Sequence, residues 1–165
     1  MELEQLRQAV AQTLNDGGMT AMVSWPDGRR KALKGPVVLV SLQGLSCSPA
    51  GMQDYLGLRQ DPDSGAWEEL YGRRAEVIFG LEVAAPSAGG AAECRGTFER
   101  LVQVLQQARP GGLTVRQLTG GEVEYDEKEG LLVLRVELRC SGWLYAAGNE
   151  GGSFLDFVLK GDVKV

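Results

Sequence analysis

The fold is constrained most by a long alternation of apolar and charged residues between Arg73 and Ala85. Successive side chains of a β-strand point to opposite faces, so this alternation predicts a strand with one buried face and one solvated face. The same pattern returns between Leu131 and Cys140. The apolar positions of the first segment are Ala75, Val77, Phe79, Leu81 and Val83, and the charged ones are Arg74, Glu76 and Glu82. Two long, half-buried strands are therefore expected.

Further segments have the composition of strands. Residues 36–42 are rich in valine and leucine and almost uninterrupted, which favours a central strand covered on both faces. The charged segment Asp126–Gly130 predicts a hairpin turn before the strand that begins at Leu131. Shorter strands are predicted at Met19–Trp25, at Leu113–Leu118 and from Phe154 to about Leu159.

Two segments have the three- and four-residue spacing of amphipathic helices, and turn residues follow each of them, at 15–18 and 110–112. Their apolar faces comprise Leu3, Leu6, Val10 and Leu14 in the first, and Cys94, Phe98, Leu101, Val102 and Leu105 in the second. The order of elements predicts an α+β fold, with a mostly antiparallel sheet of about four to six strands and two helices packed on one face. No linker divides residues 1–165, so a single domain is expected.

The segment between residues 44 and 69 lacks a regular period and contains many glycine, serine and proline residues, so a long irregular loop is expected there. Loops of this length inside a compact domain are uncommon and usually functional. Four large side chains are embedded in it: Met52, Tyr55, Leu56 and Trp67. The sequence leaves two interpretations open. These side chains pack on the core of their own domain, or they contact a neighbouring subunit, since aromatic residues and methionine are enriched at interfaces.

Composition argues against several function classes. The net charge is -5 and the basic clusters are short, whereas nucleic-acid binders usually present a basic face. The absence of histidine removes the commonest general base and metal ligand. The three cysteines form no CxxC pair, and no glycine-rich phosphate loop is present. We therefore expect no catalytic residues, no cofactor and no metal, and no sequence-specific contact with nucleic acid.

Clustered carboxylates leave an enzyme or a small-molecule binding domain as an alternative. Glu68 and Glu69 form one cluster, and residues 122–127 form another, which includes Glu124 and Asp126. Such groups serve in acid–base chemistry or cation binding. Runs of charge are nevertheless usually solvated surface, and the second cluster has the character of an exposed hairpin tip.

The chain also lacks the features of an exported or membrane-spanning protein. Its N-terminus has no basic run followed by an apolar stretch, and the longest apolar run, Trp143–Ala147, is far shorter than the ~20 residues of a spanning helix. Cys94 and Cys140 lie at apolar positions, where a free thiol behaves as a small hydrophobic group. We expect synthesis in a reducing cytoplasm and no membrane contact.

Three short motifs carry a resemblance to a known family. They are Asp54-Tyr55-Leu56-Gly57, Glu69-Leu70-Tyr71-Gly72 and Gly121-Glu122-Val123-Glu124-Tyr125-Asp126, placed among the elements described above. In this order they resemble the tail terminator, or tail-completion, proteins of bacteriophages and prophages, over most of the chain. The resemblance implies a structural protein made in the bacterial cytoplasm that forms a ring, commonly a hexamer. Such a ring caps the tail tube, meets the head connector and has no catalytic residues.

A ring requires contacts in which one patch of a subunit meets a different patch of the next. The segment 44–69 is the candidate for one patch through the four large side chains named above. Arg73 and Arg74 follow it and are expected to pair with acids such as Glu124 and Asp126 across the interface. An adaptor that binds another cytosolic protein through the same segment is a further alternative.

Overall fold

A computed structural model describes residues 3–26, 33–51, 54–148 and 158–160 of the chain. Its helices are α1 (Leu3–Asp16) and α2 (Gly90–Gln106), with short 3-10 turns at Ser87–Gly89 and Pro110–Gly112. Its strands are β1 (Ala21–Met22), β2 (Val37–Pro49), β3 (Tyr55–Gln60), β4 (Trp67–Pro86), β5 (Thr114–Asp126), β6 (Leu131–Gly148) and β7 (Val158–Lys160). Neither helix of these described ranges is long and apolar enough to cross a membrane.

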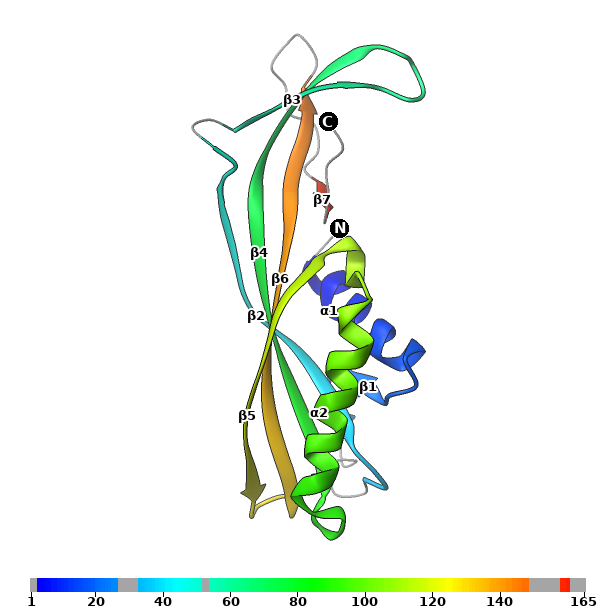
Figure 1. Ribbon diagram of the computed structural model, residues 1–165, viewed down its shortest axis with the longest axis vertical. Helices are drawn as coiled ribbons and strands as arrows, with labels where there is room; N and C mark the ends of the chain where they lie inside the picture. The colour runs from blue at the N-terminus through cyan, green and yellow to red at the C-terminus, as the bar shows by residue number, and fades with distance from the viewer. Residues whose placement is uncertain (1–2, 27–32, 52–53, 149–157, 161–165) are drawn as a thin grey trace.

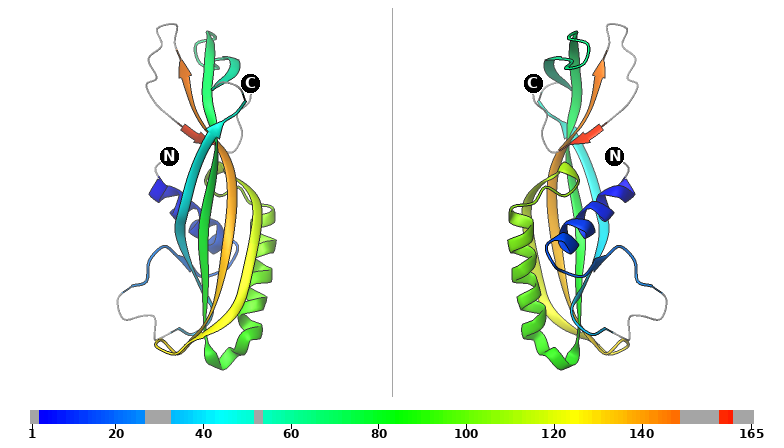
Figure 2. Two further views of the ribbon diagram at one scale, coloured as in Figure 1. Left: turned by 90° about the vertical axis from the view of Figure 1, so that its left-hand side faces the viewer. Right: turned by 90° about the vertical axis from the view of Figure 1, so that its right-hand side faces the viewer.

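The strands form one sheet in the order β1-β2-β4-β6-β5, with β3 paired to β4 and β7 paired to β6 (Figure 1). The β1–β2 pair is parallel and the other described pairs are antiparallel. Both helices cover the same face of this sheet (Figure 2). The predicted α+β class, with two helices on one face of a mostly antiparallel sheet, is confirmed. Two of the seven strands, β1 and β7, contain only two and three residues.

The long alternating segment forms β4, the centre of the sheet. Its alternating apolar side chains Val77, Phe79 and Leu81 are at most 1% exposed and point toward the helices. Arg74 and Glu76, at the intervening positions, are exposed. Because β2 and β6 pair with β4 on its two sides, this strand joins the two halves of the sheet.

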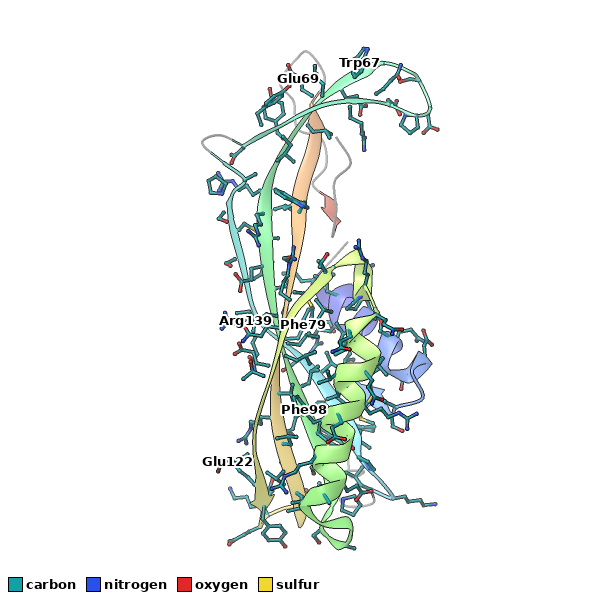
Figure 3. The ribbon with its side chains drawn as sticks, viewed as in Figure 1. Trp67, Glu69, Phe79, Phe98, Glu122 and Arg139 are labelled. Carbon is teal, nitrogen blue, oxygen red and sulfur yellow. The ribbon has the colours of Figure 1, made fainter. Side chains whose placement is uncertain are left out.

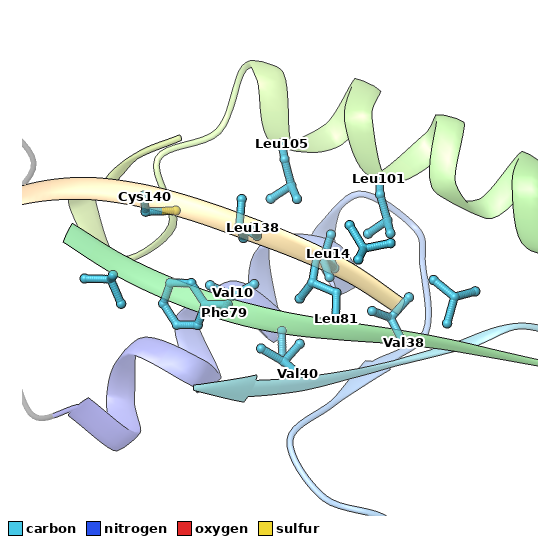
Figure 4. Close-up of a cluster of buried hydrophobic side chains, with 14 of the residues drawn as sticks. Val10, Leu14, Val38, Val40, Phe79, Leu81, Leu101, Leu105, Leu138 and Cys140 are labelled. Atoms are coloured by element: carbon cyan, nitrogen blue, oxygen red, sulfur yellow. The ribbon is translucent and has the colours of Figure 1, made fainter. Parts of the chain in front are cut away.

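The core lies between the sheet and the two helices (Figure 4). Leu6, Val10 and Leu14 of α1 are buried as the helical spacing predicts, whereas Leu3 is 45% exposed because it lies at the first residue of the helix. Helix α2 contributes Cys94, Leu101 and Leu105, and the sheet contributes Val38, Val40, Phe79, Leu81, Leu138 and Cys140. The predicted faces of both helices therefore meet one continuous core, except that Phe98 of α2 is only partly buried against it and Val102 is half-buried outside it.

Residues 44–69 are not the irregular loop that the sequence predicts. Strand β2 continues to Pro49 and pairs with β4 as far as Arg73, after a bulge between Leu42 and Gly44. Strand β3 then pairs with the first residues of β4, around a turn at residues 61–66. Backbone pairing with a long central strand thus overrides the glycine, serine and proline residues that argued for a loop.

Three other boundaries differ from the expectation. The strand predicted at 19–25 contains only Ala21 and Met22. The strand predicted at 113–118 continues to Asp126, because a bulge between Gly120 and Val123 carries the pairing past Gly120 and Gly121. Of the last predicted strand, residues 154–157 lie outside the described residues, and β7 begins at Val158.

The helices cover only part of the length of the sheet. In Figure 1 they lie against its lower half, while β2, β4 and β6 continue upward to the β3–β4 hairpin. We call this upper portion, formed by residues 45–49, 54–75 and 141–144, the arm. The core residues named above thus occupy the lower half, and the arm projects from it.

Candidate assembly surface

The arm carries exposed apolar side chains that the core does not use. Trp67 is 70% exposed, and three others are between 42% and 48% exposed. These three are Leu45 on β2 and Tyr55 and Leu58 on β3. Four of the six large apolar side chains that are exposed in the described part of the chain therefore lie on the arm. Single exposed apolar residues are ordinary, but a concentration on one projecting element is typical of a contact surface.

Tyr55 and Trp67 are held by strand pairing. Tyr55 lies opposite Tyr71, and the two rings meet edge to face with centroids 5.4 Å apart at 63°. The Tyr71 hydroxyl donates a hydrogen bond to Glu69 over 2.6 Å, which raises the pKa of Tyr71. Trp67 begins β4 opposite Gln60. The aromatic side chains are thus presented from an ordered ladder, which lowers the entropy lost when they bind.

The turn of the β3–β4 hairpin is also ordered. The Asp61 amide donates to the carbonyl of Ala66 over 2.8 Å, and the Ser64 hydroxyl donates to Asp61 Oδ2 over 2.5 Å. The Ser64 hydrogen bond is the main cause that lowers the pKa of Asp61. Gly65 supplies the positive φ of 71° that a side chain would oppose. The tip of the arm therefore has a defined shape in the isolated chain.

The predicted interface residues fall into two groups at opposite ends of the sheet. Tyr55, Leu56 and Trp67 lie on the arm, with Leu56 half-buried, whereas Met52 lies outside the described residues. The other group, Glu124 and Asp126, lies by the β5–β6 hairpin, and Figure 3 shows the separation through Trp67 and Glu122. Within one chain, the two groups do not form a single site.

Some charged residues of the predicted interface already have partners within the same chain. Arg73 forms an ion pair with Asp54 over 3.1 Å, and Glu124 forms one with Arg135 over 2.8 Å. Asp126 accepts hydrogen bonds from the amides of Lys128 and Glu129 in the hairpin turn. Arg74 is exposed, and no ion pair joins it to another described residue. Arg74 is therefore the arginine of the predicted pair that is open to a contact with another chain.

The two carboxylate clusters considered for chemistry lie at opposite ends of the sheet and do not form one site. Glu68 pairs with Arg59 over 3.1 Å, and Glu69 accepts the hydroxyl of Tyr71. The β5–β6 hairpin borders an open depression of ≈ 460 Å³, in which Arg135 and Lys128 lie beside Glu82, Glu124, Asp126 and Glu127. Within the described ranges, no group of three histidine, cysteine, aspartate or glutamate side chains is placed to hold a metal ion.

The sequence interpretation missed two features of this surface. Leu45 and Leu58 belong to the exposed apolar set, and they escaped notice because their segments had no recognised period. The turn signal Asp61-Pro62-Asp63-Ser64-Gly65, with apolar residues on both sides, is typical of a hairpin and was available in the sequence. Reading it as a hairpin would have placed both flanking segments in strands.

No protein-family model and no curated protein matches the chain. Among solved structures, it is similar to a protein described as the sheath/tube terminator of PVC, an extracellular contractile injection system, in the extended state. The alignment covers 100% of this chain and 63% of that one, with 10% sequence identity and a TM-score of 0.48. The chain thus spans less than two thirds of the length of this neighbour.

Proposed function

We propose that the chain is a structural subunit of a phage tail or phage-tail-like particle, which forms a ring on the end of the tail tube and joins it to the head connector. The observation that carries the proposal is the arm, a sheet extension with ordered, exposed aromatic side chains. Trp67 is 70% exposed and Tyr55 is 44% exposed, so the arm offers apolar area to a partner. Large aromatic residues of this kind dominate the energy of protein interfaces.

Two further considerations support an assembly role over a catalytic one. The motifs at residues 54–57, 69–72 and 121–126 resemble tail terminator proteins, which act by stoichiometric binding. Of the carboxylates considered for chemistry, Glu68, Glu69, Glu124 and Asp126 pair with arginine, tyrosine or backbone amides. In this role the arm of one subunit contacts the next subunit or the tube, and the helix-covered half keeps the domain folded.

Deletion of the gene from the genome that encodes it tests the proposal. Induced particles imaged by negative-stain electron microscopy should then show separate heads and tails, and expression of the wild-type chain from a plasmid should restore joined particles. A deletion strain that produces joined particles at the wild-type yield would contradict the role. Labelling the chain with a gold-binding tag should place it at one end of the tail.

A further inference from the structure

A depression of ≈ 340 Å³ lies midway along the sheet, on the face away from the helices. Arg74, Glu76 and Arg139 occupy positions that alternate with core residues of β4 and β6, so they face outward. The polar and charged side chains of its lining are Arg74, Glu76, Arg116, Gln117, Arg139 and Ser141. Three arginines against one glutamate make this lining positively charged, although the whole chain carries a net charge of -5.

Two of the three arginines are fixed in place. Arg116 Nε donates to the Ser141 hydroxyl over 2.6 Å, and Ser141 is 5% exposed. Arg139 lies between Glu137, at 2.6 Å, and Glu76, at 3.5 Å. Arg74 is exposed and forms no ion pair with another described residue. The charge of Arg139 is thus compensated by two carboxylates, and Arg116 and Arg74 are the arginines of the lining whose charge is left for an incoming anion.

The tip of the β5–β6 hairpin has the complementary character. Five carboxylates and one lysine lie between residues 122 and 129, and Tyr125 among them is 57% exposed. Glu124 and Asp126 are engaged by Arg135 and by the turn. Glu122, Glu127 and Glu129 form no ion pair within the described part of the chain. The tip is thus an acidic hairpin turn with an exposed aromatic side chain.

This tip cannot occupy the depression of its own chain. Asp126 pairs with Leu131, which precedes Arg139 by eight residues in β6. At a rise of about 3.3 Å per residue, that separation is about 26 Å. Glu122, at the near end of the tip, lies between the residues that pair with Leu134 and Val136, and Figure 3 shows that it too lies apart from Arg139. The amide of Gly130 donates to the carbonyl of Asp126 over 2.8 Å and closes the turn tightly. An occupant with the chemistry of the tip must come from another molecule.

We infer that the acidic tip of one copy, residues 122–129, docks into the arginine-lined depression of a second copy. Glu122, Glu127 and Glu129 would lie against Arg74 and its neighbouring arginines, with the Tyr125 ring against a guanidinium group. The two patches are different, so the contact is heterologous and repeats from copy to copy, and it gives a closed ring when the rotation between neighbours closes. The inference rests on the proposed self-assembly and supplies a specific contact for it.

Two variants test the two patches one at a time. Glu122→Gln, Glu127→Gln and Glu129→Gln together neutralise the tip, while Arg74→Glu with Gln117→Glu places two carboxylates in the depression and leaves Arg116 and Arg139 unchanged. Glu4→Gln, Glu93→Gln and Glu99→Gln on the helices remove three negative charges, as the tip variant does, and serve as its control. Thermal melts should show that all three variants fold. Sedimentation velocity at low ionic strength then measures association of the full chain.

The wild type and the helix control should form oligomers that dissociate as salt is added. Each patch variant alone should associate at least about tenfold more weakly, since several exposed ion pairs of modest strength are removed. An equimolar mixture of the two patch variants should give a heterodimer that grows no further, because only one intact tip meets one intact depression. Unchanged oligomers of either variant would overturn this contact and leave self-assembly standing. A wild type that stays monomeric at low ionic strength and millimolar concentration would also overturn it, and the gene deletion would still test the particle role separately.

Discussion

Replacement of Trp67 by alanine should separate the arm from the core. Trp67 is 70% exposed, so about 30% of its surface is covered in the folded chain. For a side chain of about 250 Å², this is about 75 Å², or about 2 kcal/mol at about 25 cal/mol per Å². That figure is an upper limit, because the unfolded chain already shields part of this area and alanine retains some of it. Trp67→Ala should therefore lower the free energy of unfolding by about 1 kcal/mol.

Phe79→Ala is the matched core substitution on the same strand. Phe79 is 0% exposed, and removal of a fully buried phenylalanine costs about 3–5 kcal/mol, including the cavity left behind. Urea unfolding should be followed by far-UV circular dichroism, since the loss of a tryptophan alters the fluorescence signal. If Trp67→Ala were as destabilising as Phe79→Ala, Trp67 would belong to the core of its own domain, and the reasoning from its exposure would be wrong.

Two further predictions concern the packing. Gly17→Ala should lower the free energy of unfolding by about 1–3 kcal/mol, because the added Cβ would lie 2.7 Å from both methyl carbons of Val104. Gly96 lies inside α2 with open space where a Cβ would stand, so Gly96→Ala should raise the free energy of unfolding by about 0.5–1 kcal/mol. Urea titrations that find Gly17→Ala more stable than Gly96→Ala would contradict this packing. A thiol reagent such as DTNB should modify Cys47 in the folded protein but Cys94 and Cys140 only after unfolding. Burial raises the pKa of Cys94, and that of Cys140 to about 12, so rapid modification of either in the folded state would refute their placement.

The two helices and the two long alternating strands of the lower half follow closely from local sequence patterns. The alternation in β4 and the helical spacing in α1 and α2 each express a face that must be buried, so the pattern identifies both the element and its direction. Val77, Phe79 and Leu101 are all 0% exposed, as their positions predict. Both helices lie on one face because both long strands have a single apolar face.

The arm could not be predicted in the same way, because it depends on pairing between distant residues. Strand β2 bulges near Gly44, and β3 bulges between Tyr55 and Gly57. Each bulge inserts an extra residue and so changes which side chains share a face. The alternation of buried and exposed positions in the core therefore does not predict the faces of the strand beyond the bulge. The exposure of Trp67 depends on where β4 extends past the helices. The candidate residues were thus identifiable by type, while their arrangement into two distant groups required the structure.

The most direct test of the assembly role uses the aromatic residues of the arm in a functional particle. The deletion strain should be complemented with the wild type, with Tyr55→Ala and Trp67→Ala together, or with Leu3→Ala, an exposed apolar residue on α1 that serves as the control. Joined particles should be counted by electron microscopy, after purified protein has shown a cooperative melt. We predict normal counts for wild type and Leu3→Ala, and few joined particles for the folded aromatic variant. A folded aromatic variant that joins heads to tails at the wild-type yield would contradict the account.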